Sequence, residues 1–173
     1  MQTIDTVRGD LTTEHADALV NAANSALLGG TGVDGALHAA AGPALLAACR
    51  ELRATTHPDG LPVGEAVATE AGLLPATWVI HTVGPNRHSG NTDETLLADA
   101  YHHSLDVAVN LGARTVAFPA IGAGAYGWDA DTAARVAVLA VAGHPRTGIE
   151  RVRFVLFNDE LYRAFRAELN RLV

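Results

Sequence analysis

Short runs of apolar, largely β-branched residues alternate along the chain with segments in which apolar residues recur every three or four positions. The short runs predict strands, and several are apolar at nearly every position, which indicates a sheet buried on both faces. Strands that alternate with amphipathic helices are typical of a layered α/β domain. The predicted strands cover residues 2–8, 17–22, 66–71, 78–83, 115–120 and 151–157.

Helix boundaries follow from capping residues. Pro43 suits the first turn of a helix that runs to about Arg53. Further helices are predicted to begin after a polar capping residue, and two of them to end at a glycine. They run from Asn91 or Thr92 to near Gly112, from Asp129 or Asp131 to Gly143, and onward from Asn158 or Asp159. Residues 55–64 and 84–91 are predicted to be surface loops.

The chain has 173 residues, 49% of them hydrophobic, which is enough for a sizeable core, and we expect a single domain over residues 1–173. No stretch predicts a membrane span, and residues 1–10 lack the pattern of a secretory signal. Cys49 is the only cysteine, which excludes a disulfide framework and fits a reducing, cytoplasmic setting. Because Cys49 lies in a helical run, we expect it to pack in the core rather than act as a catalytic thiol.

The charge balance excludes several chemistries. The chain has 12 basic residues against 19 acidic ones, a net charge of −7, and every basic residue is an arginine. Without lysine there is no Schiff-base nucleophile, no lysine base and no Walker-type phosphate loop. An acidic chain without a basic cluster is also a poor candidate for binding the phosphate backbone of nucleic acids. An anionic ligand would therefore be held by neutral donors or a few arginines.

Two glycine-rich loops follow predicted strands, at residues 29–35 and 121–127. Such a loop before a helix lets the backbone approach a phosphate and aims N–H groups at it. Together the loops would suit a diphosphate gripped from two sides in the crevice of an open α/β sheet, although both are also compatible with tight structural turns. Residues 122–127 match the G-x-G-x-x-G dinucleotide fingerprint, but a helical segment follows where the fingerprint needs a strand and an acidic residue.

Two polar residues near the first loop are candidates for binding or catalysis. Asn24 ends a predicted strand and either hydrogen-bonds a sugar hydroxyl or ties its own loop as an Asx turn. Asp34 lies inside the loop, where bound phosphates would repel its carboxylate unless something compensates. It either caps a helix that begins at Gly35 or Ala36 or positions a water.

The other candidates favour neither a metal site nor a serine hydrolase. No histidine pair has a metal-binding spacing with a carboxylate, and no serine lies in a Gly-x-Ser-x-Gly elbow. His81 lies inside a predicted strand and is expected to be a buried imidazole with satisfied hydrogen bonds rather than a base. Phe154 and Phe157 are both most simply core residues, although Phe157, at the carboxyl end of its strand, is also placed where a base could stack on it.

Ordered motifs cover nearly the whole chain. The first two are Arg8-Gly-Asp-Leu-Thr12 and Val20-Asn-Ala-Ala-Asn24. Residues 24–38, Asn-Ser-Ala-Leu-Leu-Gly-Gly-Thr-Gly-Val-Asp-Gly-Ala-Leu-His, follow with Ala41-Gly-Pro43, and Ile80-His-Thr-Val-Gly-Pro85 and Phe118-Pro-Ala-Ile-Gly-Ala-Gly-Ala-Tyr-Gly127 complete the series. In this order the motifs resemble those of the macrodomain family, and of its MacroD type in particular.

The resemblance implies a three-layer α/β/α fold with a mixed, six-stranded sheet that binds ADP-ribose across the strand carboxyl ends, without a metal or cofactor. It implies that Asp10 accepts the adenine 6-amino group with Leu11 beside it, and that Phe157 stacks on the adenine. Asn24 would hold the distal ribose, and Asp34 would orient or activate a water. The residues implied to donate backbone N–H groups to the phosphates are Gly32, Val33, Gly122, Ala123, Gly124, Ala125 and Tyr126.

The MacroD branch removes ADP-ribose from acidic side chains of proteins and deacetylates O-acetyl-ADP-ribose, so the resemblance implies an ADP-ribosyl hydrolase. The leaving carboxylate of such an ester has a parent pKa of about 4 and departs without a general acid. We hypothesise that a water held between Asp34 and a substrate phosphate hydrolyses the bond. We expect a monomer that binds ADP-ribose and mono-ADP-ribosylated proteins, and no nucleic acid unless it is itself ADP-ribosylated.

Other functions remain open. A non-catalytic ADP-ribose reader would share the cleft but would not need both Asn24 and Asp34, and an unrelated nucleotide-binding protein or a phosphatase acting on an ADP-ribose phosphate is a third alternative. The chain also departs from the family pattern. Thr31 stands where a glycine is common, Gly122 and Ala123 stand where relatives often carry Ser and Thr, and Trp128-Asp129 replaces a frequent Tyr-Pro.

Overall fold

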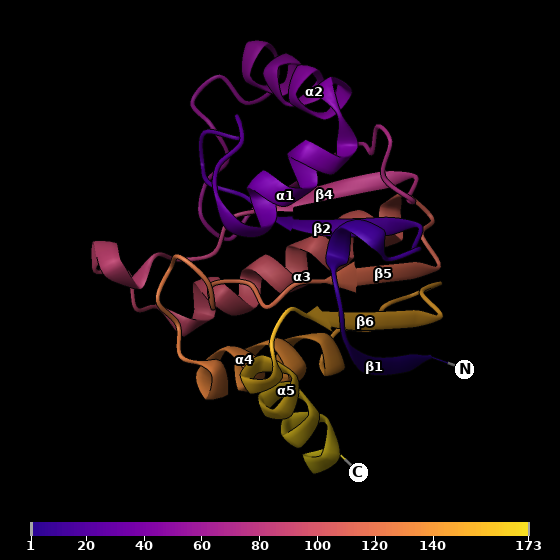
Figure 1. The fold of residues 1–173 in the computed structure, drawn as a ribbon, viewed down its shortest axis with the longest axis vertical. Helices are drawn as coiled ribbons and strands as arrows, with labels where there is room; N and C mark the ends of the chain where they lie inside the picture. The colour runs from indigo at the N-terminus through magenta and orange to yellow at the C-terminus, as the bar shows by residue number, and fades with distance from the viewer. Residues whose placement is uncertain (1, 173) are drawn as a thin grey trace.

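The computed structural model describes residues 2–172, and its centre is one sheet with the strand order β1-β6-β5-β2-β4-β3 (Figure 1). Neighbouring strands run parallel except for the edge strand β3, which is antiparallel to β4. The predicted strands are confirmed, with small differences at their ends. They are β1 (Thr3–Arg8), β2 (Ala18–Ala22), β3 (Ala66–Glu70), β4 (Trp78–Thr82), β5 (Thr115–Phe118) and β6 (Arg151–Leu156).

Helices and short 3-10 turns connect the strands. The caps of α4 and α5 are Asp129 and Asn158, each among the predicted candidates, and their side chains accept from backbone N–H groups of the first turn. The cap of α3 is Asp93 and not Asn91 or Thr92, because the carboxylate of Asp93 accepts from an N–H of that helix. The elements are η1 (Leu11–Thr13), α1 (Gly32–Ala41), α2 (Pro43–Ala54), η2 (Arg87–Ser89), α3 (Glu94–Asn110), α4 (Ala130–Ala142) and α5 (Asp159–Arg171).

Helix α1 begins earlier than the sequence predicts. Its first residue is Gly32 and its cap is Thr31, whose extended backbone (φ −107°, ψ 177°) leads into the first turn. Asp34 therefore lies inside the first turn, and the suggestion that it caps a helix starting at Gly35 or Ala36 is wrong. The glycine-rich stretch hides this start because it has few apolar side chains to mark a buried helix face.

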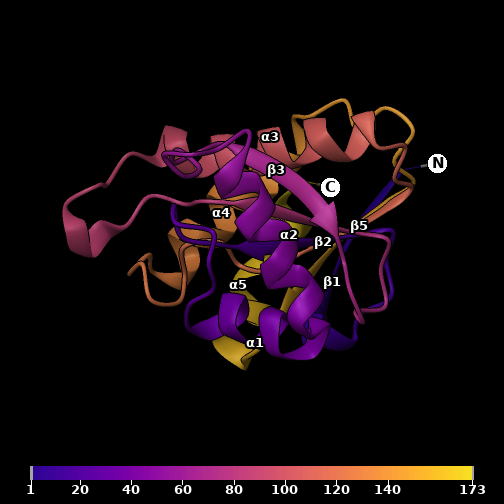
Figure 2. The same cartoon turned by 90° about the horizontal axis from the view of Figure 1, so that it is seen from above.

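Helices cover both faces of the sheet, which confirms the three-layer α/β/α arrangement (Figure 2). Alternate residues of β2 point to opposite faces: Val20 packs in the core shared with α3, α4 and α5, and Leu19 packs in the core shared with α1 and α2. Burial on both faces explains why the central strands are apolar at nearly every position. Cys49 is buried with a free thiol, as predicted. No helix within residues 2–172 is long and apolar enough to cross a membrane.

Candidate functional site

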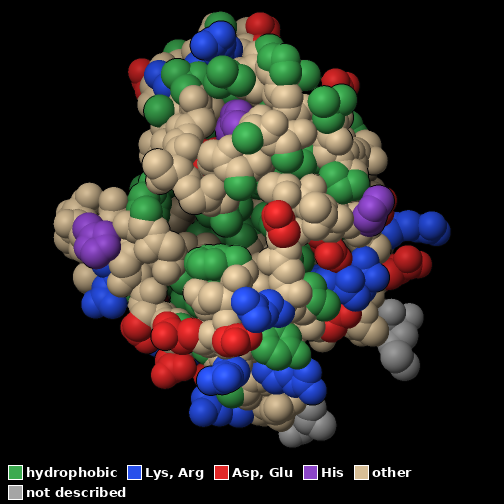
Figure 3. Space-filling model, in the orientation of Figure 1, with side chains coloured by type: hydrophobic (Ala, Val, Ile, Leu, Met, Phe, Trp, Pro, Cys, Tyr) green, Lys and Arg blue, Asp and Glu red, His purple; other side chains and the backbone are tan. Residues whose placement is uncertain are grey.

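A cleft opens where the parallel strands end. Its larger cavity, about 760 Å³, lies beside the ends of β1 and β6, and a smaller one of about 180 Å³ lies beside the ends of β2 and β5. Gly32, Val33 and Phe157 line both cavities, so the two are continuous. Figure 3 shows the hollow near the middle of this face, with hydrophobic side chains in it. Ligands of open α/β sheets bind at this edge because the strand-to-helix connections gather there.

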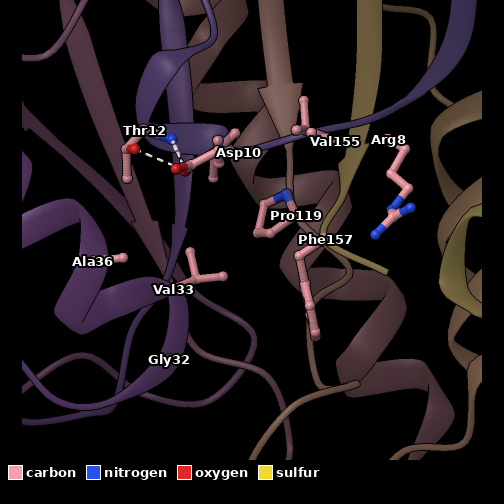
Figure 4. A pocket seen from close by; sticks show the side chains of 11 residues that line it. Arg8, Asp10, Thr12, Gly32, Val33, Ala36, Pro119, Val155 and Phe157 are labelled. Carbon is pink, nitrogen blue, oxygen red and sulfur yellow. Dashed lines mark hydrogen bonds between the residues drawn. The ribbon is translucent and has the colours of Figure 1, made fainter. Parts of the chain in front are cut away.

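The larger cavity combines an oriented carboxylate with an exposed aromatic ring. One oxygen of Asp10 accepts from the backbone N–H of Thr12 at 2.9 Å and from its hydroxyl at 2.7 Å, which fixes the carboxylate at the cavity wall. Phe157 faces the side chain of Val33 across the cavity (Figure 4). Phe157 is 57% exposed, so the expectation that it packs in the core is wrong, whereas Phe154 of the same strand segment is fully buried, as predicted. The cavity therefore offers a flat apolar slot with a hydrogen-bond acceptor at one end.

The first turn of α1 supplies unpaired N–H groups to both cavities. Gly32 and Val33 line them, and the side chain of the cap residue Thr31 accepts no hydrogen bond from this turn. The first N–H groups of a helix have no intrahelical partner, and together with the helix dipole they favour an anion at this position. This end of α1 is therefore built to receive negative charge without a basic side chain.

The second glycine-rich loop faces this helix end across the smaller cavity. Within residues 2–172, the backbone N–H groups of Gly122, Gly124, Ala125 and Tyr126 donate to no protein acceptor, and all four residues line the cavity. Ala123 differs from the prediction, because its N–H donates to the carbonyl of Ala120 at 3.2 Å and it lies outside the lining. Two sets of free N–H groups thus face one small space.

Asn24 and Asp34 converge on Gly30 in the smaller cavity. A Cβ on Gly30 would lie 2.9 Å from Oδ2 of Asp34 and 3.2 Å from Nδ2 of Asn24, so only glycine leaves this space open. Asn24 does tie its own loop: Nδ2 donates to the carbonyl of Gly29 at 3.0 Å, and Oδ1 accepts from the N–H of Leu27 at 3.2 Å. Its amide group keeps a second N–H for a ligand.

Asp34 is buried, with 4% of its surface exposed, and lies beside the proposed phosphate site. Its Oδ1 accepts from Nδ2 of Asn21 at 2.8 Å, and Nε2 of His38 lies 3.4 Å away. These contacts and its place in the first turn of α1 compensate for the repulsion expected from phosphates. Oδ2 of Asp34 is buried and has no protein hydrogen-bond partner in the described structure. A buried carboxylate oxygen needs a partner, so this atom is free to accept a hydrogen bond from a ligand or a water.

Tyr126 lines the smaller cavity. Burial raises the pKa of its hydroxyl, and the negative charge of Asp34 adds to that rise. The hydroxyl therefore stays protonated at neutral pH and is able to donate a hydrogen bond into the cavity.

Sequence reasoning did not find the buried contacts beneath the site that join His81 to Asn21 and Asn21 to Asp34. His81 has a hydrogen-bonding partner at each ring nitrogen, which confirms the prediction of a satisfied buried imidazole, but one partner is Asn21, the residue that contacts Asp34. The available signal was an amide inside an otherwise apolar strand, since a buried amide needs partners.

The departures from the family pattern at Gly122 and Trp128 are coupled. The indole of Trp128 is 4% exposed and its Nε1 donates to the carbonyl of Pro85 at 2.8 Å. The guanidinium of Arg87 lies 5.2 Å from the indole centroid. A Cβ on Gly122 would come within 2.7 Å of Trp128 Cδ1, so a serine does not fit beside this indole. The contacts of Trp128 with Pro85, Arg87 and Gly122 thereby fix the end of the loop.

Arg8 is the only cationic side chain among the described residues that line the cleft, and it pairs with Asp159 at 2.9 Å. Figure 4 places Arg8 on the far side of Phe157 from Asp10, away from the helix end of the cleft. No group of three or more potential metal ligands occurs in residues 2–172. The positive end of the cleft is therefore made by backbone N–H groups and the dipole of α1 rather than by cationic side chains.

Comparisons with known proteins match this architecture. The Macro domain family matches residues 20–137 of the chain. A Macro domain-containing protein of Streptomyces nogalater is 58% identical, with 98% of this chain and 93% of that protein covered. An O-acetyl-ADP-ribose deacetylase of Klebsiella pneumoniae is 48% identical, covering 94% and 93%. The structure of an Oceanobacillus iheyensis macrodomain with ADP superposes with a TM-score of 0.90 at 38% identity, covering 96% and 90%.

Proposed function

Because this chain belongs to the Macro domain family, we propose that its cleft binds ADP-ribose and that the protein hydrolyses acyl esters of the distal ribose. One observation carries the proposal: two sets of unpaired backbone N–H groups face a small cavity in which Oδ2 of the buried Asp34 has no partner within residues 2–172. The relative from Klebsiella pneumoniae named O-acetyl-ADP-ribose deacetylase and the Oceanobacillus macrodomain with ADP support this choice of ligand.

The ligand would lie along the whole cleft. The adenine occupies the larger cavity, with its 6-amino group toward Asp10 beside Leu11 and one face on Phe157. The diphosphate accepts hydrogen bonds from the first turn of α1, at Gly32 and Val33, and from the second loop. The distal ribose then lies in the smaller cavity beside Asn24 and Asp34. This order follows from the chemistry of each wall, since the slot suits a base and the N–H groups suit anions.

The proposed reaction needs a placed water and a group that accepts its proton. In an ADP-ribosyl aspartate or glutamate ester, the water oxygen forms a bond to C1 of the distal ribose while the bond from C1 to the ester oxygen breaks. The carboxylate leaves with the bonding electron pair, and the water proton passes to Asp34. In O-acetyl-ADP-ribose the water oxygen instead forms a bond to the acetyl carbon and the water gives a proton to Asp34, while the bond from that carbon to the ribose oxygen breaks. The ribose oxygen leaves with the bonding electron pair and takes the proton from Asp34. A carboxylate with a parent pKa of about 4 leaves without a general acid.

The substrates we propose are therefore mono-ADP-ribosylated proteins modified on acidic side chains, together with O-acetyl-ADP-ribose. We further propose that the protein acts as a monomer in the cytoplasm.

The test compares Asp34→Ala and Asn24→Ala with the wild type in two assays, calorimetric binding of ADP-ribose and release of ADP-ribose from a mono-ADP-ribosylated protein. We expect Asp34→Ala to bind ADP-ribose and to lose about 100-fold or more in turnover. Asp131→Ala is a matched control, because Asp131 lies in the first turn of α4 as Asp34 does in α1. Wild-type turnover in both site variants would show the assignment to be wrong. A wild type that binds but releases nothing is a reader, and released inorganic phosphate indicates a phosphatase.

A further inference from the structure

A line of buried polar atoms runs from the edge strand β3 across β4 and β2 to Asp34. Oγ1 of Thr69 lies 3.0 Å from Nε2 of His81, and Nδ1 of His81 lies 3.1 Å from Nδ2 of Asn21. The same Nδ2 atom donates to Oδ1 of Asp34 at 2.8 Å. All four residues are buried. Polar residues at these positions of a two-sided core weaken it unless each has a partner.

The position of each proton along this line follows from Asp34. A carboxylate only accepts, so the amide of Asn21 must turn its NH₂ group toward Asp34. The second N–H of that group then faces Nδ1 of His81, which must be unprotonated in order to accept it. Nε2 of His81 therefore carries the ring proton and donates it to the hydroxyl oxygen of Thr69.

The surroundings of His81 keep it in this neutral form. Burial, and then the charge of His38, lower the pKa of the ring to about 3. Sγ of Cys49 lies 3.7 Å from Nε2, and burial raises the pKa of that thiol to about 11, so it remains a neutral neighbour. The ring is thus fixed in one tautomer and does not carry a charge during turnover.

Resting on the function proposed above, we propose that His81 is a positioning residue for the hydrolysis: its Nδ1 holds the amide of Asn21, and the amide holds Asp34 with Oδ2 toward the attacking water. Oδ1 of Asn21 has no hydrogen-bond partner in the described part of the chain, so the amide is held only at its NH₂ end. Without an acceptor at Nδ1, the hydrogen bond to Asp34 is the only one that still orients the amide, so the position of Asp34 and of the water it holds would be less fixed.

Two amide substitutions of the same buried ring separate positioning from packing. In His81→Asn the side-chain oxygen takes the place of Nδ1 and still accepts from Asn21. In His81→Gln the added methylene moves the polar group toward the place of Nε2, near Thr69, and leaves Asn21 without an acceptor. Both variants remove the ring, so both are expected to lower the free energy of unfolding.

We expect His81→Gln to lower kcat by about 10- to 100-fold while KM and the Kd for ADP-ribose change by less than about threefold, because only the reacting geometry is disturbed. His81→Asn, which keeps an acceptor for Asn21, is expected to retain a kcat within about threefold of the wild type. Equal kcat values for the two variants, with the wild type active, would overturn the proposal for His81 and leave the proposed function standing. An inactive wild type would instead overturn the proposed function.

A second measurement keeps the proposal testable if His81→Gln does not fold. The ¹⁵N chemical shifts of the His81 ring in the wild type report its tautomer directly. We expect an unprotonated Nδ1 and a protonated Nε2 from pH 7 down to about pH 5. A proton on Nδ1 would overturn the proposal, because that nitrogen would then be unable to accept from Asn21.

Discussion

Replacing Phe157 by alanine isolates the contribution of base stacking to binding. The ring is 57% exposed, so less than half of a surface of about 200 Å² is buried in the free protein. At about 25 cal/mol per Å², alanine removes at most ~2 kcal/mol from the free energy of unfolding. The exposed part is available to a ligand, and stacking of a base on an aromatic ring contributes about 1–3 kcal/mol. The Kd for ADP-ribose should therefore rise by about 5- to 150-fold.

The assay is calorimetric titration of ADP-ribose into the wild type, Phe157→Ala and Leu139→Ala. Leu139 is a matched control because it is 54% exposed on α4 and does not line the cleft. We expect the control to bind as the wild type does and Phe157→Trp to preserve most of the affinity. A Kd for Phe157→Ala within about twofold of the wild type would refute the placement of the adenine against this ring.

Three further outcomes are expected. The Kd for ADP-ribose should change by less than about threefold between about 50 and 500 mM NaCl, since neutral donors release few counterions. Arg8→Ala should reduce what salt dependence of the Kd remains. A steep salt dependence would contradict binding by backbone N–H groups. Below pH 6.5, the ordinary pKa, His81 is protonated in the unfolded chain, but in the folded protein its pKa is about 3 and it stays neutral. The free energy of unfolding should therefore fall as the pH drops from 6.5 toward 3. That fall is up to about 1.4 kcal/mol per pH unit for this group. Denaturant unfolding between pH 4 and 7 should show that the free energy of unfolding of His81→Asn depends less steeply on pH than that of the wild type. Equal dependence in the two proteins would contradict a depressed pKa of His81. Gly122→Ser should destabilise by about 1–3 kcal/mol through its contact with Trp128 and through the strain of a side chain at a φ of +84°. Trp128→Ala removes only the contact, so in a double-mutant cycle the losses should be less than additive; additive losses would show that the indole contributes nothing to the cost.

The strands could be predicted from the sequence because each is a short, dense apolar run bounded by turn residues. The caps of α4 and α5 could be predicted too, since Asp129 and Asn158 precede clear apolar stripes, whereas the cap of α3 could not be separated from its polar neighbours. The start of α1 could not, because the glycine-rich stretch before Ala36 gives no periodic signal. The adenine-binding role of Asp10 and the catalytic role of Asp34 stay predictions.

The support beneath the site depends on sheet order rather than on local sequence. Thr69, His81 and Asn21 lie on β3, β4 and β2, and only the pairing of these three strands brings the residues into line. The contact between Gly122 and Trp128 is likewise invisible in the sequence, because a turn of the loop brings the indole back onto the glycine. The order of the motifs was enough to predict where the cleft lies, whereas the residues that orient Asp34 could be identified only from the folded structure.

The most direct test of the central claim uses the wild-type protein and a protein mono-ADP-ribosylated on acidic side chains, with and without hydroxylamine pretreatment to remove ester-linked groups. Released ADP-ribose is the quantity measured. We predict release from the untreated substrate and none after the ester-linked groups have been stripped. Tight binding of ADP-ribose without release from the untreated substrate would contradict the account.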